Sequence, residues 1–237
     1  MPAKYRVGII ASGRIAREHA RGWQECEHTQ IVAIADSHPQ ALAQFGHDFG
    51  ISRRYLDYRE MLAREQLEIV CVATHPGLHR PIVEAAVAAG AKGIFCEKPI
   101  DYDLSRIDAA LQAVEKAGVK LQIGFNRRFD PNFHRIYDLV RSGAIGDPHV
   151  LRITSRDPAP PPISYVKVSG GLFLDMAIHD FDMASFLMAS SVTEVYAAGA
   201  VLVDPAIGEV GDVDTAITTL KFADGAVGVI DNSRRSG

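Results

Sequence analysis

Lys98, Asp175 and His179 are the residues of this sequence best suited to move a proton. Lys98 stands in Glu-Lys-Pro directly after the apolar run 93–96, which predicts a short buried strand that ends at this lysine. The carboxyl edge of an open parallel sheet is where ligands bind, and an ammonium group there could stabilise an oxygen that gains negative charge. Taken alone, Lys98 is more simply a solvated lysine at a strand end, because lysines are mostly exposed.

Asp175, His179 and Asp182 are spaced i, i+4 and i+7 in a predicted helix over residues 172–189, so they share one helical face. A histidine has a suitable pKa to take the proton of a hydroxyl group, and a neighbouring carboxylate would stabilise and orient its imidazolium form. The same stripe could be a solvated polar face. Together with Lys98 and a bound hydride acceptor, the pair of Asp175 and His179 predicts the oxidation of an alcohol.

Residues 6–36 read as strand, glycine-containing turn, helix and strand, which is the outline of a dinucleotide site. Against the pattern Gly-x-Gly-x-x-Gly, the three fingerprint positions hold Ala11, Gly13 and Ala16. Alanine is a recognised variant at the third position and a departure at the first. Gly13 would let the backbone approach a pyrophosphate at a helix start, where the helix dipole favours anions. The expected contacts are Ser12, Gly13, Arg14 and Ile15.

Asp36 ends the second predicted strand about 20 residues after the turn, where a carboxylate accepts hydrogen bonds from the adenosine ribose. The next three residues are Ser, His and Pro, with no arginine to bind a 2′-phosphate. The carboxylate would also repel that phosphate, so NAD is favoured over NADP. The alternative is that Asp36 caps the next helix.

Two further loops are expected at the same sheet edge. One predicted strand ends at Thr74-His75 and the next at Glu97-Lys98, so these four residues are predicted to face the cofactor. His75 and His79 could instead bind a metal ion, but their spacing crosses a Pro-Gly turn and does not place them on one helical face. We therefore predict no metal site.

Strand–helix alternation continues to about residue 125. The predicted strands lie at 6–11, 30–35, 68–73, 93–96 and 120–125, and the predicted helices at 14–25, 39–49, 57–64, 78–89 and 104–117. The strands are continuously apolar, which is typical of parallel strands buried on both faces. We therefore predict a doubly wound parallel sheet of the Rossmann type, which forms an NAD-binding domain over residues 1–125.

After residue 125 the pattern predicts an α+β domain over residues 126–237. It begins with Arg127 and a helix at 131–142, followed by a strand at 148–157 that ends at Asp157. Three more strands are predicted at 193–203, 212–222 and 226–233, the last two joined by an Asp-Gly hairpin turn. These elements indicate a mainly antiparallel sheet with helices on one face. Arg127 and Asp157 are candidates to bind the hydroxyl groups of a polyol.

The last predicted strand ends shortly before residue 237, with no later segment to cover it. If strand 226–233 lies at a sheet edge, its unpaired backbone groups would invite pairing with another chain. The sequence thus predicts a homo-oligomer, a dimer or tetramer, formed through the second sheet.

Composition limits the partners and the compartment. The chain has 237 residues, 47% hydrophobic and 23% charged, which is typical of a globular protein. A net charge of −4, without a run of Lys or Arg, disfavours nucleic acid and anionic membranes as partners. We predict no signal peptide and no membrane span, and three widely spaced cysteines suit a reducing cytoplasm.

Over nearly its whole length the chain resembles the glucose-fructose oxidoreductase / inositol dehydrogenase / MocA family. The resemblance rests on Gly13-Arg14-Ile15, Cys96-Glu97-Lys98-Pro99, the segment 124–130 (Gly-Phe-Asn-Arg-Arg-Phe-Asp) and the segment 170–182. The segments 155–162, 168–171 and 204–209 are similar to bacterial inositol 2-dehydrogenases.

This resemblance implies NAD-linked oxidation of myo-inositol to a 2-keto-inositol, with Lys98, Asp175 and His179 as the catalytic group. It also implies that the Lys98–Pro99 bond is cis, as relatives often have it. Because full-length relatives continue with further strands and helices, it implies that the domain over residues 126–237 is C-terminally incomplete, that is, apparently truncated. Two alternatives remain: a non-catalytic member of the family that senses a sugar or a cofactor, and an inactive truncated fragment.

Overall fold

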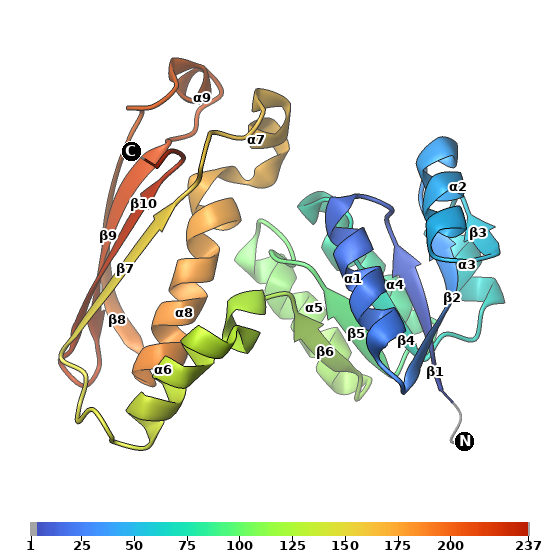
Figure 1. Cartoon of the computed structure of the whole chain (residues 1–237), viewed down its shortest axis with the longest axis horizontal. Coiled ribbons are helices and arrows are strands. Elements are labelled where there is room, and N and C mark those ends of the chain that lie inside the picture. Colours follow the sequence, from blue (N-terminus) through green and yellow to red (C-terminus); the bar gives the residue numbers. More distant parts are fainter. Residues whose placement is uncertain (1–3, 237) are drawn as a thin grey trace. The chain divides into compact units, whose positions relative to one another are not determined.

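The structure is a computed structural model that describes residues 4–236. It divides into two compact units, Met1–Gly124 and Phe125–Gly237 (Figure 1). The sequence analysis placed the end of the first domain at residue 125, which opens the second unit. Among the described residues, no helix has the length and apolar character needed to cross a membrane.

Within the described residues, the first unit is built on a six-stranded parallel sheet with the order β3-β2-β1-β4-β5-β6. Its strands are β1 (Tyr5–Ile10), β2 (Thr29–Ala35), β3 (Arg53–Tyr55), β4 (Ile69–Val72), β5 (Gly93–Cys96) and β6 (Lys120–Ile123). The strand order reverses between β1 and β4, which is where a doubly wound sheet binds dinucleotides. The predicted Rossmann-type sheet is confirmed. The prediction missed only β3, whose Arg-Arg-Tyr sequence contains no apolar run.

Helices cover both faces of this sheet. They are α1 (Arg14–Glu25), α2 (Pro39–Asp48), α3 (Tyr58–Arg64), α4 (His79–Ala88) and α5 (Leu104–Lys116), with a 3₁₀ turn, η1 (Pro76–Leu78), before α4. Ala16 of α1 and Phe45 of α2 pack with Ile9 on one face. Ile82 of α4 packs with Val70 on the other. Burial on both sides explains why the strands are continuously apolar.

The second unit holds, in the part of the chain that is described, a four-stranded sheet with the order β7-β10-β9-β8. Its elements in chain order are η2 (Asn126–Phe129), α6 (Pro131–Arg141), β7 (Val150–Arg156), α7 (Ile163–Ser169), the π-helical turn η3 (Phe173–Ala177), α8 (Ile178–Met188), β8 (Val192–Ala200), α9 (Pro205–Glu209), β9 (Thr215–Phe222) and β10 (Val227–Ser233). The β8–β9 and β9–β10 pairs are antiparallel, as predicted, and the β10–β7 pair is parallel.

β10 is an inner strand. Its residue Asp231 lies opposite Thr154 of β7 on one side and Ile217 of β9 on the other. The condition for edge pairing, that residues 226–233 lie at a sheet edge, is therefore not met, and the edges of the described sheet are β7 and β8. The hairpin at Gly225, which has a φ of 92°, fixes only the β9 side of β10. The pairing of β10 with β7 joins segments that are far apart in the sequence, so the local sequence around β10 does not predict it.

One face of the second sheet packs on α8, and the other is exposed (Figure 1). Ala184 and Met188 of α8 form a core with Phe222 of β9 and Ile230 of β10. Each strand carries an exposed apolar side chain among polar ones such as Arg152 and Lys221, and we call four of these apolar side chains, one from each strand, the outer sheet face. Its members are Val150, Tyr196, Ile217 and Val227, all of them exposed.

Candidate active site

The turn between β1 and α1 presents backbone N–H groups. β1 ends at Ile10 and α1 begins at Arg14, with Gly13 as the N-cap residue and no hydrogen bond from a described side chain to cap it. A Cβ atom on Gly13 would meet nothing within 4 Å, so open space lies in front of the helix start. The predicted residues Ser12, Gly13, Arg14 and Ile15 therefore fit a pyrophosphate group.

Ala11 adopts a glycine-like backbone. Its φ of 107° lies in the region that favours glycine, and it occupies the first position of the fingerprint. Its N–H donates to the carbonyl oxygen of Ala35 at 2.9 Å, which ties the turn to the end of β2. Ala11 thus adopts the conformation that a glycine would have at this position, at the cost of backbone strain.

Asp36 holds the turn from the neighbouring strand end. Its Oδ2 accepts hydrogen bonds from the Ser12 N–H at 2.7 Å and the Ser12 hydroxyl at 2.6 Å, and its Oδ1 accepts one from the His38 N–H at 2.8 Å. Burial alone would raise the pKa of Asp36, but these hydrogen bonds outweigh burial and lower it. The alternative that Asp36 caps α2 is wrong, because His38 is the N-cap residue and no side chain caps that helix.

Glu97 and Lys98 follow β5 at the carboxyl edge of the sheet, as predicted. One carboxylate oxygen of Glu97 lies 2.7 Å from Nε2 of His19 on α1, and the other accepts the Lys98 N–H at 3.3 Å. Burial would raise the pKa of Glu97, but the hydrogen bond and charge of His19 lower it. The Lys98–Pro99 bond is cis, which confirms the prediction. His19 was not among the predicted site residues, since only the fold brings α1 beside this strand end.

Thr74 and His75 lie between β4 and η1, at the same edge. The Thr74 hydroxyl donates to the His75 carbonyl oxygen at 3.3 Å. His79 points inward with 1% of its surface exposed. Its Nδ1 lies 2.6 Å from the Pro99 carbonyl oxygen and its Nε2 lies 2.8 Å from the Thr74 carbonyl oxygen. Because both ring nitrogens are engaged, His79 is not placed to bind a metal ion with His75.

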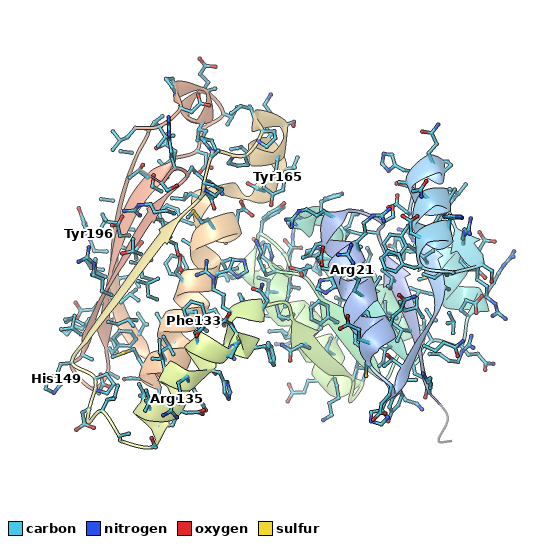
Figure 2. The ribbon with its side chains drawn as sticks, in the orientation of Figure 1. Arg21, Phe133, Arg135, His149, Tyr165 and Tyr196 are labelled. Atoms are coloured by element: carbon cyan, nitrogen blue, oxygen red, sulfur yellow. The ribbon has the colours of Figure 1, made fainter. Side chains whose placement is uncertain are left out.

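In the second unit, the structure brings the predicted residues Asp157 and Asp175 together. Asp175 accepts a hydrogen bond from the Tyr165 hydroxyl at 2.8 Å and one from Nη1 of Arg234 at 3.0 Å (Figure 2 labels Tyr165 on α7). The same Arg234 nitrogen lies 3.3 Å from Oδ2 of Asp157. The side chains of Arg234 and Asp175 are only 3% and 11% exposed. The two carboxylates therefore meet at one nitrogen of a buried guanidinium.

The single helix predicted over residues 172–189 is η3 followed by α8. The π-helical turn carries Asp175 and directly precedes α8, which carries His179 and Asp182, so the predicted single α-helix is interrupted at Asp175. Asp182 is 7% exposed and binds Arg128 through contacts of 2.5 and 2.8 Å. The alternative of a solvated polar stripe is therefore wrong for Asp175 and Asp182. The ring of His179 meets that of Phe125 edge-on, with 6.4 Å between centroids.

Arg127 reaches a carboxylate that the sequence analysis did not single out. Its guanidinium binds Asp180 of α8, which is completely buried. Asp180 also accepts hydrogen bonds from the Ser155 hydroxyl of β7 and the Asn232 amide of β10, both at 2.7 Å. The one available signal was the acidic residue directly after His179. Asn232 and Arg234 gave no signal, because their roles depend on the inner position of β10.

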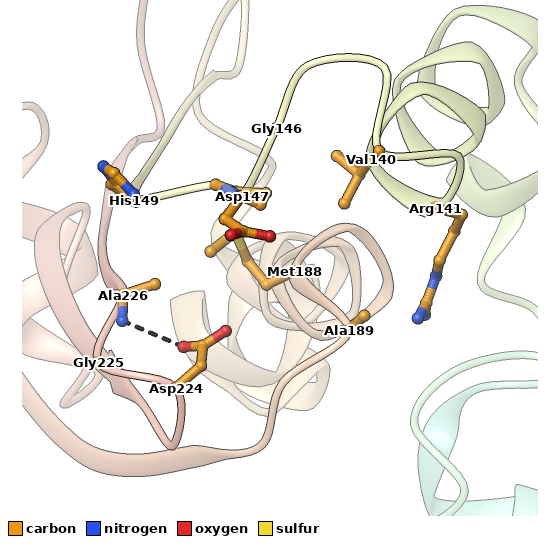
Figure 3. A pocket seen from close by; sticks show the side chains of 12 residues that line it. Val140, Arg141, Gly146, Asp147, His149, Met188, Ala189, Asp224, Gly225 and Ala226 are labelled. Atoms are coloured by element: carbon orange, nitrogen blue, oxygen red, sulfur yellow. Dashed lines mark hydrogen bonds between the residues drawn. The ribbon is translucent and has the colours of Figure 1, made fainter.

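A hollow of about 700 Å³ in the second unit has no predicted site residue in its lining (Figure 3). It is formed by the end of α6, the loop 143–149, the end of α8 and the β9–β10 turn, and it includes Arg141, Asp147, His149 and Asp224. Asp224 accepts the N–H of Ala226 at 3.1 Å and so closes its own turn. This hollow adds nothing to the candidate active site.

Known proteins match the chain over both units. A family model described as "Oxidoreductase family, NAD-binding Rossmann fold" matches residues 5–125, and one described as "GFO/IDH/MocA C-terminal domain" matches residues 133–237. The myo-inositol 2-dehydrogenase of Thermotoga maritima is 47% identical over 98% of this chain and 69% of its own length. The inositol 2-dehydrogenase of Rhizobium meliloti is 42% identical, with the same coverage.

A solved structure of scyllo-inositol dehydrogenase from Lactobacillus casei, with bound NAD(H) and scyllo-inositol, superposes with a TM-score of 0.91. It is 29% identical, and the match covers 99% of this chain and 71% of that chain. The present chain thus spans about two thirds of the length of the curated relatives, whose covered share is 69%.

Replacing Ala11 with glycine should relieve the strain in the turn. We expect Ala11→Gly to raise the free energy of unfolding of the first unit by about 1 kcal/mol, because a positive φ costs glycine little. Thermal and urea unfolding would measure the change. Ala109→Gly, on the exposed side of α5, is the matched control and should lower it by about 1 kcal/mol. Destabilisation by Ala11→Gly would contradict the strain.

Proposed function

The chain belongs to the GFO/IDH/MocA oxidoreductase family, and we propose that it oxidises a ring hydroxyl of a cyclic polyol to a ketone with NAD. The favoured substrate is myo-inositol, oxidised at carbon 2, as the name of the Thermotoga maritima relative suggests. The observation that carries the proposal is the buried Asp175, held by Tyr165 and Arg234 four residues before His179. Such a buried carboxylate near a histidine suits a site that must take up a proton.

We assign NAD to the first unit, residues 1–125. The N–H groups at the start of α1 would hold the pyrophosphate, and Asp36 would accept hydrogen bonds from the ribose hydroxyls. Thr74, His75, Glu97 and Lys98, at the ends of β4 and β5, would line the nicotinamide side. When bound, NAD supplies the acceptor for the hydride at nicotinamide C4.

The catalytic group in this proposal is Lys98, Asp175 and His179. His179 takes the proton of the substrate hydroxyl, and Asp175 favours the imidazolium that results. Lys98 donates hydrogen bonds to the reacting oxygen and stabilises its negative charge as the carbon–hydrogen bond breaks. The presence of all three residues favours an enzyme over the alternative of a non-catalytic sensor.

The second unit, residues 126–237, would bind the substrate. Arg127 and Asp157 are proposed to hold neighbouring hydroxyl groups. A guanidinium has five N–H donors and a carboxylate has about four acceptor sites, so the contacts of Arg127 to Asp180 and of Asp157 to Arg234 leave capacity for a polyol. Their existing partners would fix their orientation before the substrate arrives.

We further propose that the enzyme works as a homo-oligomer in the cytoplasm. Cys26, Cys71 and Cys96 are free thiols, which suits a reducing compartment. On the outer sheet face, Val150 is 70% exposed and Tyr196 is 71% exposed. Exposed apolar patches of this kind mark interaction surfaces. A second copy of the chain is the proposed partner of this face.

The double variant Val150→Lys, Tyr196→Asp should convert the oligomer to a monomer, because it places charges on the outer sheet face. Light scattering coupled to gel filtration would give the mass. Leu104→Lys is the control, since Leu104 is a highly exposed apolar residue on α5 and should leave the mass unchanged. A monomeric unmutated protein would rule out the proposed assembly.

Asp36→Ala should weaken NAD binding by about tenfold, which is the scale of a lost hydrogen bond to a charged group. It should also reduce the discrimination against NADP, because the repelling carboxylate is gone. Calorimetric titration with both cofactors would measure this. Ser12→Ala removes one contact to the turn but keeps the carboxylate, so it should retain the preference for NAD. Equal affinity of the unmutated chain for both cofactors would refute the role of Asp36.

His179→Ala should lower the rate of polyol oxidation by about 10²–10⁴, the usual contribution of a general base. NAD affinity should stay within about twofold of the unmutated value, since His179 belongs to the second unit. NADH formation with a panel of cyclic polyols, followed by absorbance, would measure the rate. Undiminished turnover in the variant would remove His179 from the mechanism, and no turnover of any polyol by the unmutated protein would favour the sensor.

A further inference from the structure

His79 is a buried titratable residue that the proposed function does not use. It is the first residue of α4, and its ring lies between two backbone carbonyl groups, those of Thr74 and Pro99. Thr74 belongs to the loop after β4, and Pro99 directly follows Lys98 in the loop after β5. One side chain therefore connects the two loops that follow neighbouring strands at the carboxyl edge of the sheet.

The two contacts make different demands on the ring. A carbonyl oxygen only accepts hydrogen bonds, and a neutral imidazole has a single N–H to donate. Burial lowers the pKa of His79, although both carbonyl groups act in the opposite direction. A neutral ring thus satisfies one carbonyl at a time, whereas a protonated ring satisfies both. The contacts can therefore be separated by a side chain that reaches only one of the two carbonyl groups.

The neighbouring residue strengthens the hold of α4 on the second loop. Nε of Arg80 donates to Oδ2 of Asp101 at 3.0 Å, and Oδ1 of Asp101 accepts the N–H of Tyr102 at 2.7 Å. Asp101 is itself buried. The first two residues of α4 thus hold the chain at Pro99 and at Asp101, immediately after Lys98.

We propose that His79 is a positioning residue for both loops. Its contact with the Pro99 carbonyl sets the place of Lys98, and its contact with the Thr74 carbonyl sets the loop that faces the cofactor. The inference rests on the proposed function for the roles of Lys98 and of the Thr74 loop. The first contact then governs turnover, and the second governs the affinity for NAD.

Two isosteric variants separate these effects. The side-chain amide of Asn stands near the place of Nδ1, so His79→Asn can still contact the Pro99 carbonyl and loses the contact with the Thr74 carbonyl. The amide of Gln stands near the place of Nε2, so His79→Gln does the reverse. His79→Gln should lower kcat by about 10²-fold, the scale of a 1 Å misplacement, with NAD affinity nearly unchanged. His79→Asn should lose NAD affinity by about fivefold and lose much less of kcat.

Calorimetric titration with NAD and initial rates with myo-inositol would give the two quantities. Ile82→Val is the control, because Ile82 is fully buried on the same helix and belongs to the sheet core, so it should move neither. Parallel losses of kcat and NAD affinity in both variants, or the reverse assignment, would overturn the proposal. A merely structural role predicts such parallel losses.

Arg80→Gln keeps the inference testable if both His79 variants unfold, because the Arg80 side chain is partly exposed and is less needed for folding. It should lower kcat by about tenfold at constant NAD affinity, and an unchanged kcat would overturn the role of this loop. Hydrogen exchange supplies a readout that needs no activity. Segment 98–103 should exchange faster in His79→Gln and segment 74–78 faster in His79→Asn, and the opposite pattern would also overturn the proposal. A lack of polyol oxidation by the unmutated protein would instead count against the proposed function alone.

Discussion

The carboxylate of Asp180 has no exposed surface, and the second unit is arranged around it. A buried charge is tolerated only when it is paired and hydrogen-bonded, and removing one partner costs about 3–5 kcal/mol. The partners Arg127, Ser155 and Asn232 come from η2, β7 and β10. These contacts hold α8 in its register on the sheet, and the π-helical turn that carries Asp175 directly precedes α8.

The first unit uses the same means at its sheet edge. Residues that would contact a ligand are already held by a partner from another element: Asp36 by the β1–α1 turn, and Glu97 by His19 of α1. Such contacts fix side chains and loops before a ligand binds, so less ordering remains to be done on binding. Asp36 also has a double role, because the carboxylate expected to accept ribose hydroxyls is the one that orders the turn next to the pyrophosphate.

The sequence predicted features that depend on local pattern. The apolar runs located β1, β2, β4, β5 and β6, and the rule that ligands bind at strand ends directed attention to Asp36 and Lys98. It did not predict features that depend on distant partners. The residues of the π-helical turn at Asp175 have the sequence pattern of an ordinary α-helix, so the turn could not be predicted. Arg234 reaches Asp175 only because β10 lies inside the sheet. Likewise, α9 follows a loop held by the buried Asp214, which accepts the N–H groups of residues 202–204.

The place of β10 between β7 and β9 has a consequence for the order in which the chain folds. The first sheet is assembled from strands that follow one another closely, so it can form while the rest of the chain is still being made. β7 instead waits for β10, with α7, α8, β8, α9 and β9 synthesised in between. During that interval the edge of β7 that β10 will cover is unpaired. Asn232 of β10, which donates a hydrogen bond to Asp180, has not yet been synthesised. The first unit can therefore fold on the ribosome well before β7 and β10 pair, and the interval between these events is when a nascent chain most needs protection from its neighbours.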